Sequence, residues 1–317
     1  MIGVHLEGGR VEIRDVARPP RREGFALIRL ICAGICNTDL ELQRGYYGFA
    51  GIPGHEFVGE VAEAESKALM GRRVVGEINL ACGNCDWCRR DMGRHCPHRS
   101  VLGIVNHPGA FQEFLTLPER NLHVLPDSIS TEAAVFVEPL AAACEILEQV
   151  AMPCGAQVAV LGDGKLGLLA ALVLNAYGYR VHQFGRHREK LGISERAGVN
   201  VEIAGDRLPL ASYDWVVEAT GSREGLQAAV KIARPRGTVI MKSTVHGPAA
   251  MDTAAVIVNE LTLVGSRCGR FEPALELLRL GTIDVGDLIS ERMPLQDARR
   301  GFERAGEKGV LKVLLEN

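Results

Sequence analysis

Four cysteines lie close together in the pattern C-x2-C-x2-C-x7-C: Cys82, Cys85, Cys88 and Cys96. Four thiolates at this spacing match the tetrahedral coordination of Zn²⁺, and Gly83 and Gly93 permit the tight turns of a metal knot. A disulfide framework is disfavoured in a long chain without an export signal. Four cysteine ligands leave no open coordination position, so we expect a structural zinc. Free thiols on a loop are the alternative.

A second group of metal-binding residue types lies upstream, in "AGICNTDLE" and "GIPGHEFVGE". Cys36, His55 and Glu56 can together hold a zinc ion that keeps room for a substrate oxygen. Taken singly, Cys36 can be a buried thiol and His55 a hydrogen-bonded turn residue. The neighbouring motifs favour the metal site over these alternatives.

The segment "VAVLGDGKLG" carries Gly162, Gly164 and Gly167 as G-x-G-x-x-G, after a strand and at the start of a helix. This context is typical of a dinucleotide-binding turn, in which a pyrophosphate sits on the helix N-terminus. Lys165 and Leu166 lie within the expected binding turn. The side chains of Asp163 and Lys165 are expected to face solvent. The alternative is a tight turn without a ligand.

Two patterns of elements must position these residues. The first part of the chain shows short β-like runs between Gly, Pro and charged turns, at 25–32, 56–63, 72–77 and 111–117. From about residue 155 strands and helices alternate, which predicts a parallel sheet. The expected strands are 156–162, 179–185, 214–221, 237–243 and 260–266; the expected helices are 165–178, 188–198, 224–233 and, as the last large helix, the one that begins at 272.

The segment "SISTEAAVFVEPLAAACEILEQV" joins the two patterns and is helical on both sides of Pro139. Proline is favoured at the first position of a helix, so the second helix is expected to begin at Pro139 with Glu138 at its cap. A carboxylate at such a junction is a candidate ligand-site residue.

Composition excludes several classes of function. The net charge of -3 gives no reason to expect nucleic acid or an anionic membrane as a partner. Charged residues occupy the N-terminal stretch where a signal peptide would be apolar, and the longest apolar stretch is too short to span a bilayer. A cytoplasmic location is therefore expected.

In order along the chain, "GICNTD", "GHEFVGE", the four-cysteine segment, "VEPLAAA" and "LGDGKLG" resemble the zinc-dependent medium-chain alcohol dehydrogenases. The resemblance is to the branch with sorbitol, threonine and glucose dehydrogenases. It implies an α/β protein with a GroES-like β-rich catalytic domain (1–138), a Rossmann doubly wound parallel sheet (139–269) and a return to the catalytic domain (270–317). It also implies a homodimer or homotetramer.

The resemblance further implies roles for individual residues. Cys36 and His55 bind a catalytic zinc, and Glu56 and Glu138 compete for or share the remaining position. Thr38 hands on the substrate proton, and Asp39 orients His55. Glu41 stands where such families often carry a histidine at the outer end of the proton relay, which puts proton exit by that route in question.

The cofactor prediction depends on the end of the second strand, "RVHQFGRHR". NAD-specific folds place an acidic residue there, about twenty positions past the glycines. Gly185 occupies that position, which leaves room for a 2′-phosphate, and Arg186 offers a bidentate fork. NADP(H) is therefore predicted, with Arg186 as the main phosphate contact and Arg188 and Thr220 as further cofactor contacts. Alternatively, Arg186 and Arg188 form a solvated helix start and NAD binds without its usual acid.

These inferences together predict a zinc-dependent oxidoreductase with two zinc ions per chain. It would transfer hydride between a secondary alcohol or polyol, or the matching ketone or aldehyde, and NADP(H). The alternatives are an NAD(H)-dependent polyol or amino-alcohol dehydrogenase and a non-catalytic protein that binds zinc and a nucleotide.

Overall fold

The computed structural model describes residues 1–205, 208–244 and 251–317. The chain forms two compact units. The first unit combines Met1–Glu138 with Leu275–Asn317, and the second unit is Pro139–Ala274. The first unit is therefore built from two separate segments of the sequence.

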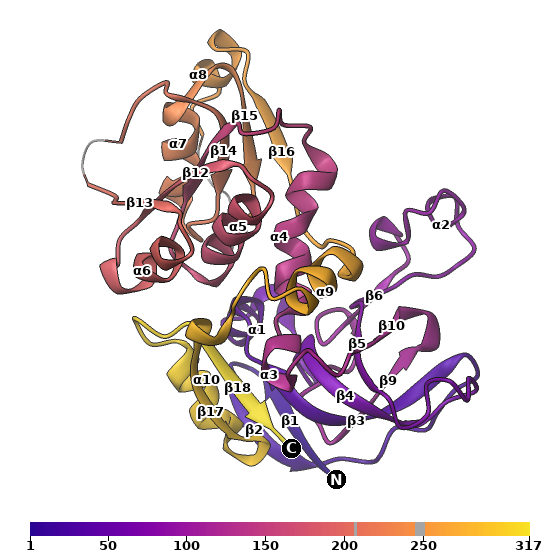
Figure 1. Ribbon diagram of the computed structural model, residues 1–317. Helices are drawn as coiled ribbons and strands as arrows, with labels where there is room; N and C mark the ends of the chain where they lie inside the picture. Colours follow the sequence, from indigo (N-terminus) through magenta and orange to yellow (C-terminus); the bar gives the residue numbers. More distant parts are fainter. Residues whose placement is uncertain (206–207, 245–250) are drawn as a thin grey trace. The chain divides into compact units, whose positions relative to one another are not determined.

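A mixed sheet forms the centre of the first unit (Figure 1). Within the described residues its strand order is β10-β5-β4-β3-β18-β17, and β9 also pairs with β3. The last two strands of that order come from the segment 275–317, and β18 runs antiparallel to β3 with Leu314 opposite Gly34. The strands are β3 (Phe25–Gly34), β4 (Glu56–Glu63), β5 (Arg73–Gly76), β9 (Phe114–Pro118), β10 (Leu122–Val124), β17 (Ile289–Pro294) and β18 (Lys312–Glu316).

An antiparallel hairpin precedes this sheet, made by β1 (Ile2–Glu7) and β2 (Arg10–Asp15). Its two-residue loop, Gly8 and Gly9, has positive φ at both positions (53° and 79°), which matches the twist of the two strands. The remaining elements of the unit are α1 (Asn37–Gln43), β6 (Asn79–Leu80), α2 (Asp86–Arg89), β7 (Ser100–Leu102), β8 (Asn106–His107), α3 (Thr131–Ala134), α9 (Phe271–Arg279), which begins just before the unit boundary, and α10 (Ala298–Ala305).

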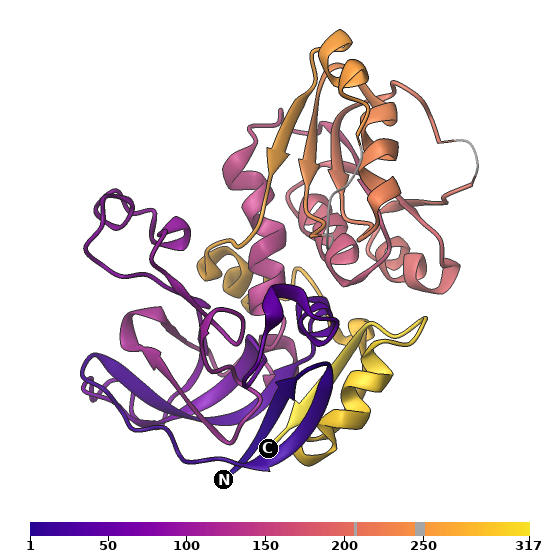
Figure 2. The same ribbon diagram turned by 180° about the vertical axis from the view of Figure 1, so that it is seen from behind.

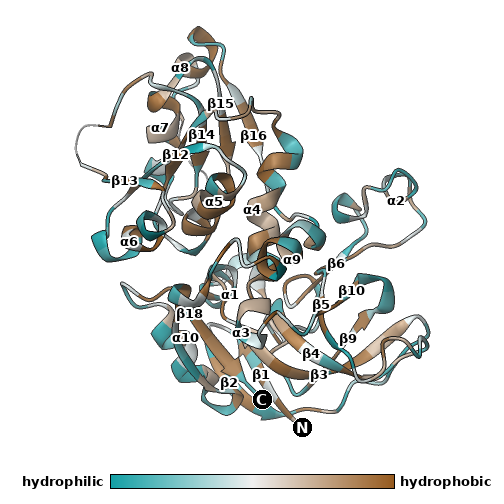
Figure 3. Ribbon diagram, in the orientation of Figure 1, coloured by the Kyte–Doolittle hydropathy of each residue, from teal (hydrophilic) through white to brown (hydrophobic). Residues whose placement is uncertain are grey.

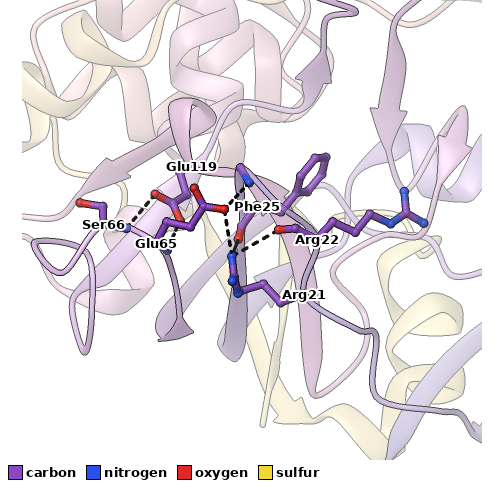
Figure 4. Close-up of polar contacts among 7 residues, drawn as sticks. Arg21, Arg22, Phe25, Glu65, Ser66 and Glu119 are labelled. Carbon is purple, nitrogen blue, oxygen red and sulfur yellow. Dashed lines mark hydrogen bonds and ion pairs between the residues drawn. The ribbon is translucent and has the colours of Figure 1, made fainter.

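Two glutamates fasten the turns at one end of the sheet (Figure 4). Glu65 accepts a hydrogen bond from the backbone N–H of Gly24, just before β3, and pairs with Arg21. Glu119, just after β9, accepts hydrogen bonds from the backbone N–H groups of Glu65 and Ser66. These carboxylates connect three turns that are far apart in the sequence.

The second unit contains a parallel sheet, and within the described residues its order is β13-β12-β11-β14-β15-β16. The order reverses between β11 and β14. Parallel sheets of this kind bind ligands outside the carboxyl ends of the strands at such a reversal. The strands are β11 (Gln157–Leu161), β12 (Arg180–Gly185), β13 (Asn200–Ile203), β14 (Tyr213–Glu218), β15 (Ala233–Met241) and β16 (Thr262–Gly265).

Helices cover both faces of the parallel sheet (Figures 1 and 2). One face carries α5 (Lys165–Ala176) and α6 (Arg188–Arg196), and the other carries α7 (Arg223–Ile232) and α8 (Thr253–Val258). The helix α4 (Val137–Gln149) precedes β11. Figure 3 shows α5 as hydrophobic along its length, and its residues from Gly167 to Leu174 are all buried. Such a helix is typical of a core position.

The architecture confirms the predicted fold class, a β-rich domain followed by a doubly wound parallel sheet. Two local predictions were wrong. The helix α4 begins at Val137 and not at Pro139, so Glu138 lies in its first turn and not at its cap. Proline is tolerated there because the first N–H groups of a helix have no partner within the helix. The helix at 271–279 is also not the last of its size, since α10 follows it.

Among the helices of residues 1–205, 208–244 and 251–317, none combines the length and the apolar character needed to cross a bilayer.

A buried lysine connects the end of β15 to two neighbouring segments of the second unit. Lys242 is 6% exposed and donates to the carbonyl oxygens of Ala142 and Arg267 and to the hydroxyl of Ser266. We predict that Lys242→Met lowers the free energy of unfolding by about 2–4 kcal/mol, because buried acceptors lose a charged donor. Urea unfolding measures this, with the exposed Lys231→Met as the control. Equal stability of both variants would contradict the assigned role.

Candidate metal centres and dinucleotide turn

The four-cysteine segment forms one compact cluster in the structure. The Sγ atoms lie 3.5 Å apart for Cys85 and Cys88, 3.5 Å for Cys82 and Cys96, 3.7 Å for Cys85 and Cys96, and 3.9 Å for Cys82 and Cys88. Zn–S bonds of about 2.3 Å place tetrahedral sulfurs about 3.8 Å apart. A disulfide needs about 2.05 Å. The separations therefore fit a metal site and exclude a disulfide.

Two thiols of the four-cysteine cluster differ in acidity. Backbone hydrogen bonding at Asn84 lowers the pKa of the Cys82 thiol to about 6, whereas burial raises the pKa of Cys88 to about 11. Metals bind the thiolate form, so the lowered pKa of Cys82 favours metal binding and the raised pKa of Cys88 opposes it.

The second group of ligands comes from the ends of two neighbouring strands. Cys36 follows β3 and caps α1, and His55 and Glu56 stand at the start of β4. One ligand atom from each of the three residues lies within 4.8 Å of the others. Because β3 and β4 are antiparallel, with Gly34 opposite Glu56, the end of one strand meets the start of the other. The predicted trio is thus brought together.

The carboxylate of Asp39 contacts the residues that carry this group of ligands. This carboxylate is fully buried and accepts hydrogen bonds from the backbone N–H groups of Cys36 (2.8 Å) and Gly54 (3.2 Å). Its Oδ1 also lies 3.4 Å from Nδ1 of His55, which leaves Nε2 for a metal. Burial opposes a charge on His55, yet Asp39 and Cys36 raise the pKa of the imidazole well above its usual range.

Lys312 is a member of the site that the sequence analysis missed. Its ammonium group forms an ion pair with Oε2 of Glu56, and both side chains are 1% exposed. Burial opposes this charge, yet Glu56 and Cys36 raise the pKa of Lys312 above its ordinary value. The other carboxylate oxygen, Oε1, is buried and has no hydrogen-bond partner in the described part of the chain. An orphaned oxygen beside Cys36 and His55 fits a metal ligand.

The other predicted site residues of the first unit lie as follows. The Thr38 hydroxyl is 3.8 Å from Sγ of Cys36, close enough to share the site. The Glu41 carboxylate pairs with Arg44. Glu138 is half-buried and, among the described residues, is not part of the group formed by Cys36, His55 and Glu56.

The glycine-rich turn of the second unit has the predicted strand–turn–helix context. Gly162 has φ 119°, and a Cβ on it would lie 2.3 Å from the carbonyl oxygen of Ala219. A Cβ on Gly167 would lie 2.5 Å from the carbonyl oxygen of Gly162. A Cβ on Gly164, by contrast, would meet nothing within 4 Å. Two glycines are therefore required by packing, and the open position at the start of α5 fits a pyrophosphate.

The structure changes the interpretation of the residues near Gly185. Asp163 is 8% exposed, so the prediction that it faces solvent was wrong. A Cβ on Gly185 would lie 2.8 Å from Oδ2 of Asp163, so the space expected beside this glycine is filled by a carboxylate. Arg186 is exposed, and its guanidinium has no hydrogen bond or ion pair with any residue that the structure describes.

Two other predicted cofactor contacts already have protein partners. Arg188 forms two hydrogen bonds with the carboxylate of Glu195. The Thr220 hydroxyl donates to Glu218. Lys165 and Leu166 form the first turn of α5 and are half-buried.

Comparisons with known proteins agree with this geometry. Residues 22–127 match the alcohol dehydrogenase GroES-like domain, and residues 166–280 match the zinc-binding dehydrogenase model. The L-threonine 3-dehydrogenase of Chelativorans sp. (strain BNC1) is 31% identical over 92% of this chain and 90% of its own. The D-arabitol-phosphate dehydrogenase of Enterococcus avium is 27% identical over 96% and 93%. A protein of Sinorhizobium meliloti 1021, solved bound to NADP, has 26% identity and a TM-score of 0.90, with 100% and 99% of the two chains covered.

Fold, metal-binding groups and glycine turn define a dehydrogenase of the zinc-dependent type. The chain belongs to the zinc-dependent medium-chain alcohol dehydrogenase family. This confirms the predicted family. It also confirms the predicted class of enzyme, a dehydrogenase that uses zinc and a nicotinamide cofactor.

We predict that Cys88→Ser removes one zinc per chain and lowers the melting temperature, because the tetrahedral cluster loses a ligand. Elemental analysis and thermal unfolding measure the two effects, and the zinc at Cys36 and His55 should remain. A variant with unchanged zinc content and melting temperature would show that the cluster does not hold a structural metal.

A second prediction concerns the buried ion pair. Lys312→Met leaves the Glu56 carboxylate without its cation, which should lower the free energy of unfolding by about 3–5 kcal/mol. The exposed Lys308→Met is the matched control and should stay within about 0.5 kcal/mol of wild type. Urea unfolding followed by circular dichroism compares the two, and similar values for both variants would refute the role of the pair.

Proposed function

We propose that the protein is a zinc-dependent dehydrogenase that transfers hydride between a secondary alcohol or polyol, or the matching carbonyl compound, and a nicotinamide dinucleotide. The observation that carries this proposal is the buried group of Cys36, His55 and Glu56 with its orphaned carboxylate oxygen. A cysteine, a histidine and a carboxylate leave a fourth position of a tetrahedral metal open for substrate.

Each residue of the first unit has a distinct task in this proposal. A zinc ion held by Cys36, His55 and Glu56 supplies a Lewis acid, and the dinucleotide supplies the hydride acceptor. The Thr38 hydroxyl takes the proton of the substrate hydroxyl while it releases its own proton to solvent, to which this half-buried side chain has access. Asp39, whose Oδ1 lies 3.4 Å from Nδ1 of His55, orients the imidazole, and Lys312 holds Oε2 of Glu56 so that Oε1 is the oxygen available to the metal. Glu138 remains the alternative ligand.

The names of the relatives support the substrate class. One relative is named for D-arabitol phosphate, a phosphorylated polyol, and one for L-threonine, an amino acid with a secondary hydroxyl beside its amino group. Both compounds carry a hydroxyl that such chemistry can oxidise. An amino-alcohol substrate is therefore the second candidate. The homodimer or homotetramer and the cytoplasmic location stay predictions.

The preference for NADP(H) also stays a prediction from Gly185 and Arg186. The exposed guanidinium of Arg186 supports it, as does the NADP-bound relative. The buried carboxylate of Asp163 beside Gly185 opposes it, because a 2′-phosphate would meet a like charge. The structure thus supports NAD(H), the alternative that the sequence left open.

The test is Cys36→Ser in the full chain. We expect zinc to fall from two ions per chain to one, and alcohol-dependent reduction of the dinucleotide to fall at least about a hundredfold. Cys32→Ala is the matched control, because Cys32 is a buried thiol of β3, the strand that precedes Cys36, and lies outside both ligand groups. It should keep both zinc ions and full activity. Full activity in Cys36→Ser would overturn the proposed function.

A further inference from the structure

The carboxylate of Asp163 lies where other members of the dinucleotide-binding fold place an acidic residue at the end of the second strand. Gly185 is the last residue of β12 and carries no side chain. A Cβ built on it would lie 2.6 Å from Cβ of Asp163 and 2.8 Å from Oδ2. The glycine-rich loop thus fills the volume that a strand-end acid would occupy.

Hydrogen bonds hold this carboxylate in place. Its Oδ2 accepts from the backbone N–H groups of Arg186 (2.7 Å) and His187 (2.6 Å) and lies 3.0 Å from the ring Nδ1 of His187. No hydrogen bond to Oδ1 is found within residues 1–205, 208–244 and 251–317, so this oxygen is available to a ligand. One oxygen of the Asp163 carboxylate, Oδ2, is therefore held by the residues that follow β12, and the other, Oδ1, remains for a ligand.

Such a carboxylate discriminates between the two dinucleotides. The 2′- and 3′-hydroxyls of an adenosine ribose are hydrogen-bond donors, and a fixed carboxylate at the strand end accepts from them. A 2′-phosphate carries negative charge and needs donors. The two backbone N–H groups nearest to this position already donate to Asp163. A phosphate would therefore meet a like charge and lose two donors.

We propose that Asp163 is the specificity-determining residue for the dinucleotide and selects NAD(H) over NADP(H). The carboxylate comes from the glycine-rich loop and not from the strand end, and the missing side chain of Gly185 leaves the space that it occupies. This inference rests on the proposed function only in requiring that the turn binds a nicotinamide dinucleotide.

The experiment measures dissociation constants of the zinc-loaded full chain for NADH and NADPH by cofactor fluorescence. Wild type should bind NADH at least about tenfold more tightly than NADPH. Asp163→Asn keeps the shape but removes the charge, and should shift the ratio of the two constants toward NADPH by about tenfold or more. Glu189→Gln is the matched control, since Glu189 is an exposed acid in the first turn of α6. It should leave the ratio within about twofold of wild type.

A double variant that moves the acid from residue 163 to residue 185 tests the proposal even if a single substitution disturbs the fold. Asp163→Gly should lose the preference, and adding Gly185→Asp to it should restore the preference from the strand end. Restored selectivity in the folded double variant supports the proposal. Wild type that prefers NADPH, or an Asp163→Asn ratio equal to wild type, overturns it. A wild type that binds neither dinucleotide overturns the proposed function instead.

Discussion

Lys312 and Glu56 meet inside the first unit with almost no exposure to solvent, and the candidate catalytic site is arranged around their ion pair. Lys312 is the first residue of β18, and Glu56 is the first residue of β4, with β3 lying between these strands. The ion pair lies next to Gly34, and a Cβ on this glycine would lie 2.7 Å from Oε2 of Glu56, which is too close. A buried charge without a partner is costly, so the segment 275–317 must dock in this register for the site to form.

The two candidate metal groups and the glycine turn follow different physical rules. In the four-cysteine cluster the ligands are neighbours in sequence, and short turns bring them together. In the Cys36 group the ligands come from two strands, and the sheet fixes their separation. In the glycine turn the packing of Gly162 against Ala219 and of Gly167 against Gly162 leaves one open position, Gly164. Local sequence, strand pairing and close backbone approach each determine one of these three features.

These rules explain which features could be predicted. Strand 56–63 and the helix after the glycine turn were found because their periodicity and their bounding turns are local. Lys312 was missed because its partner lies 256 residues away and its neighbours form an apolar strand. Asp163 was misread because its partners are backbone N–H groups, which a sequence does not distinguish. The hairpin at Gly8 and Gly9 did carry a signal, since paired glycines between alternating residues indicate such a turn.

The division of the first unit into two segments has a consequence for synthesis on the ribosome. The second unit is continuous in sequence, from Pro139 to Ala274, so all of its strands have been synthesised before the last part of the first unit is translated. The parallel sheet can thus fold during translation. The sheet that holds Cys36 and His55 stays incomplete until residue 312 emerges, with Glu56 lacking its buried cation. The candidate metal site at Cys36 and His55 is consequently completed late in the synthesis of the chain.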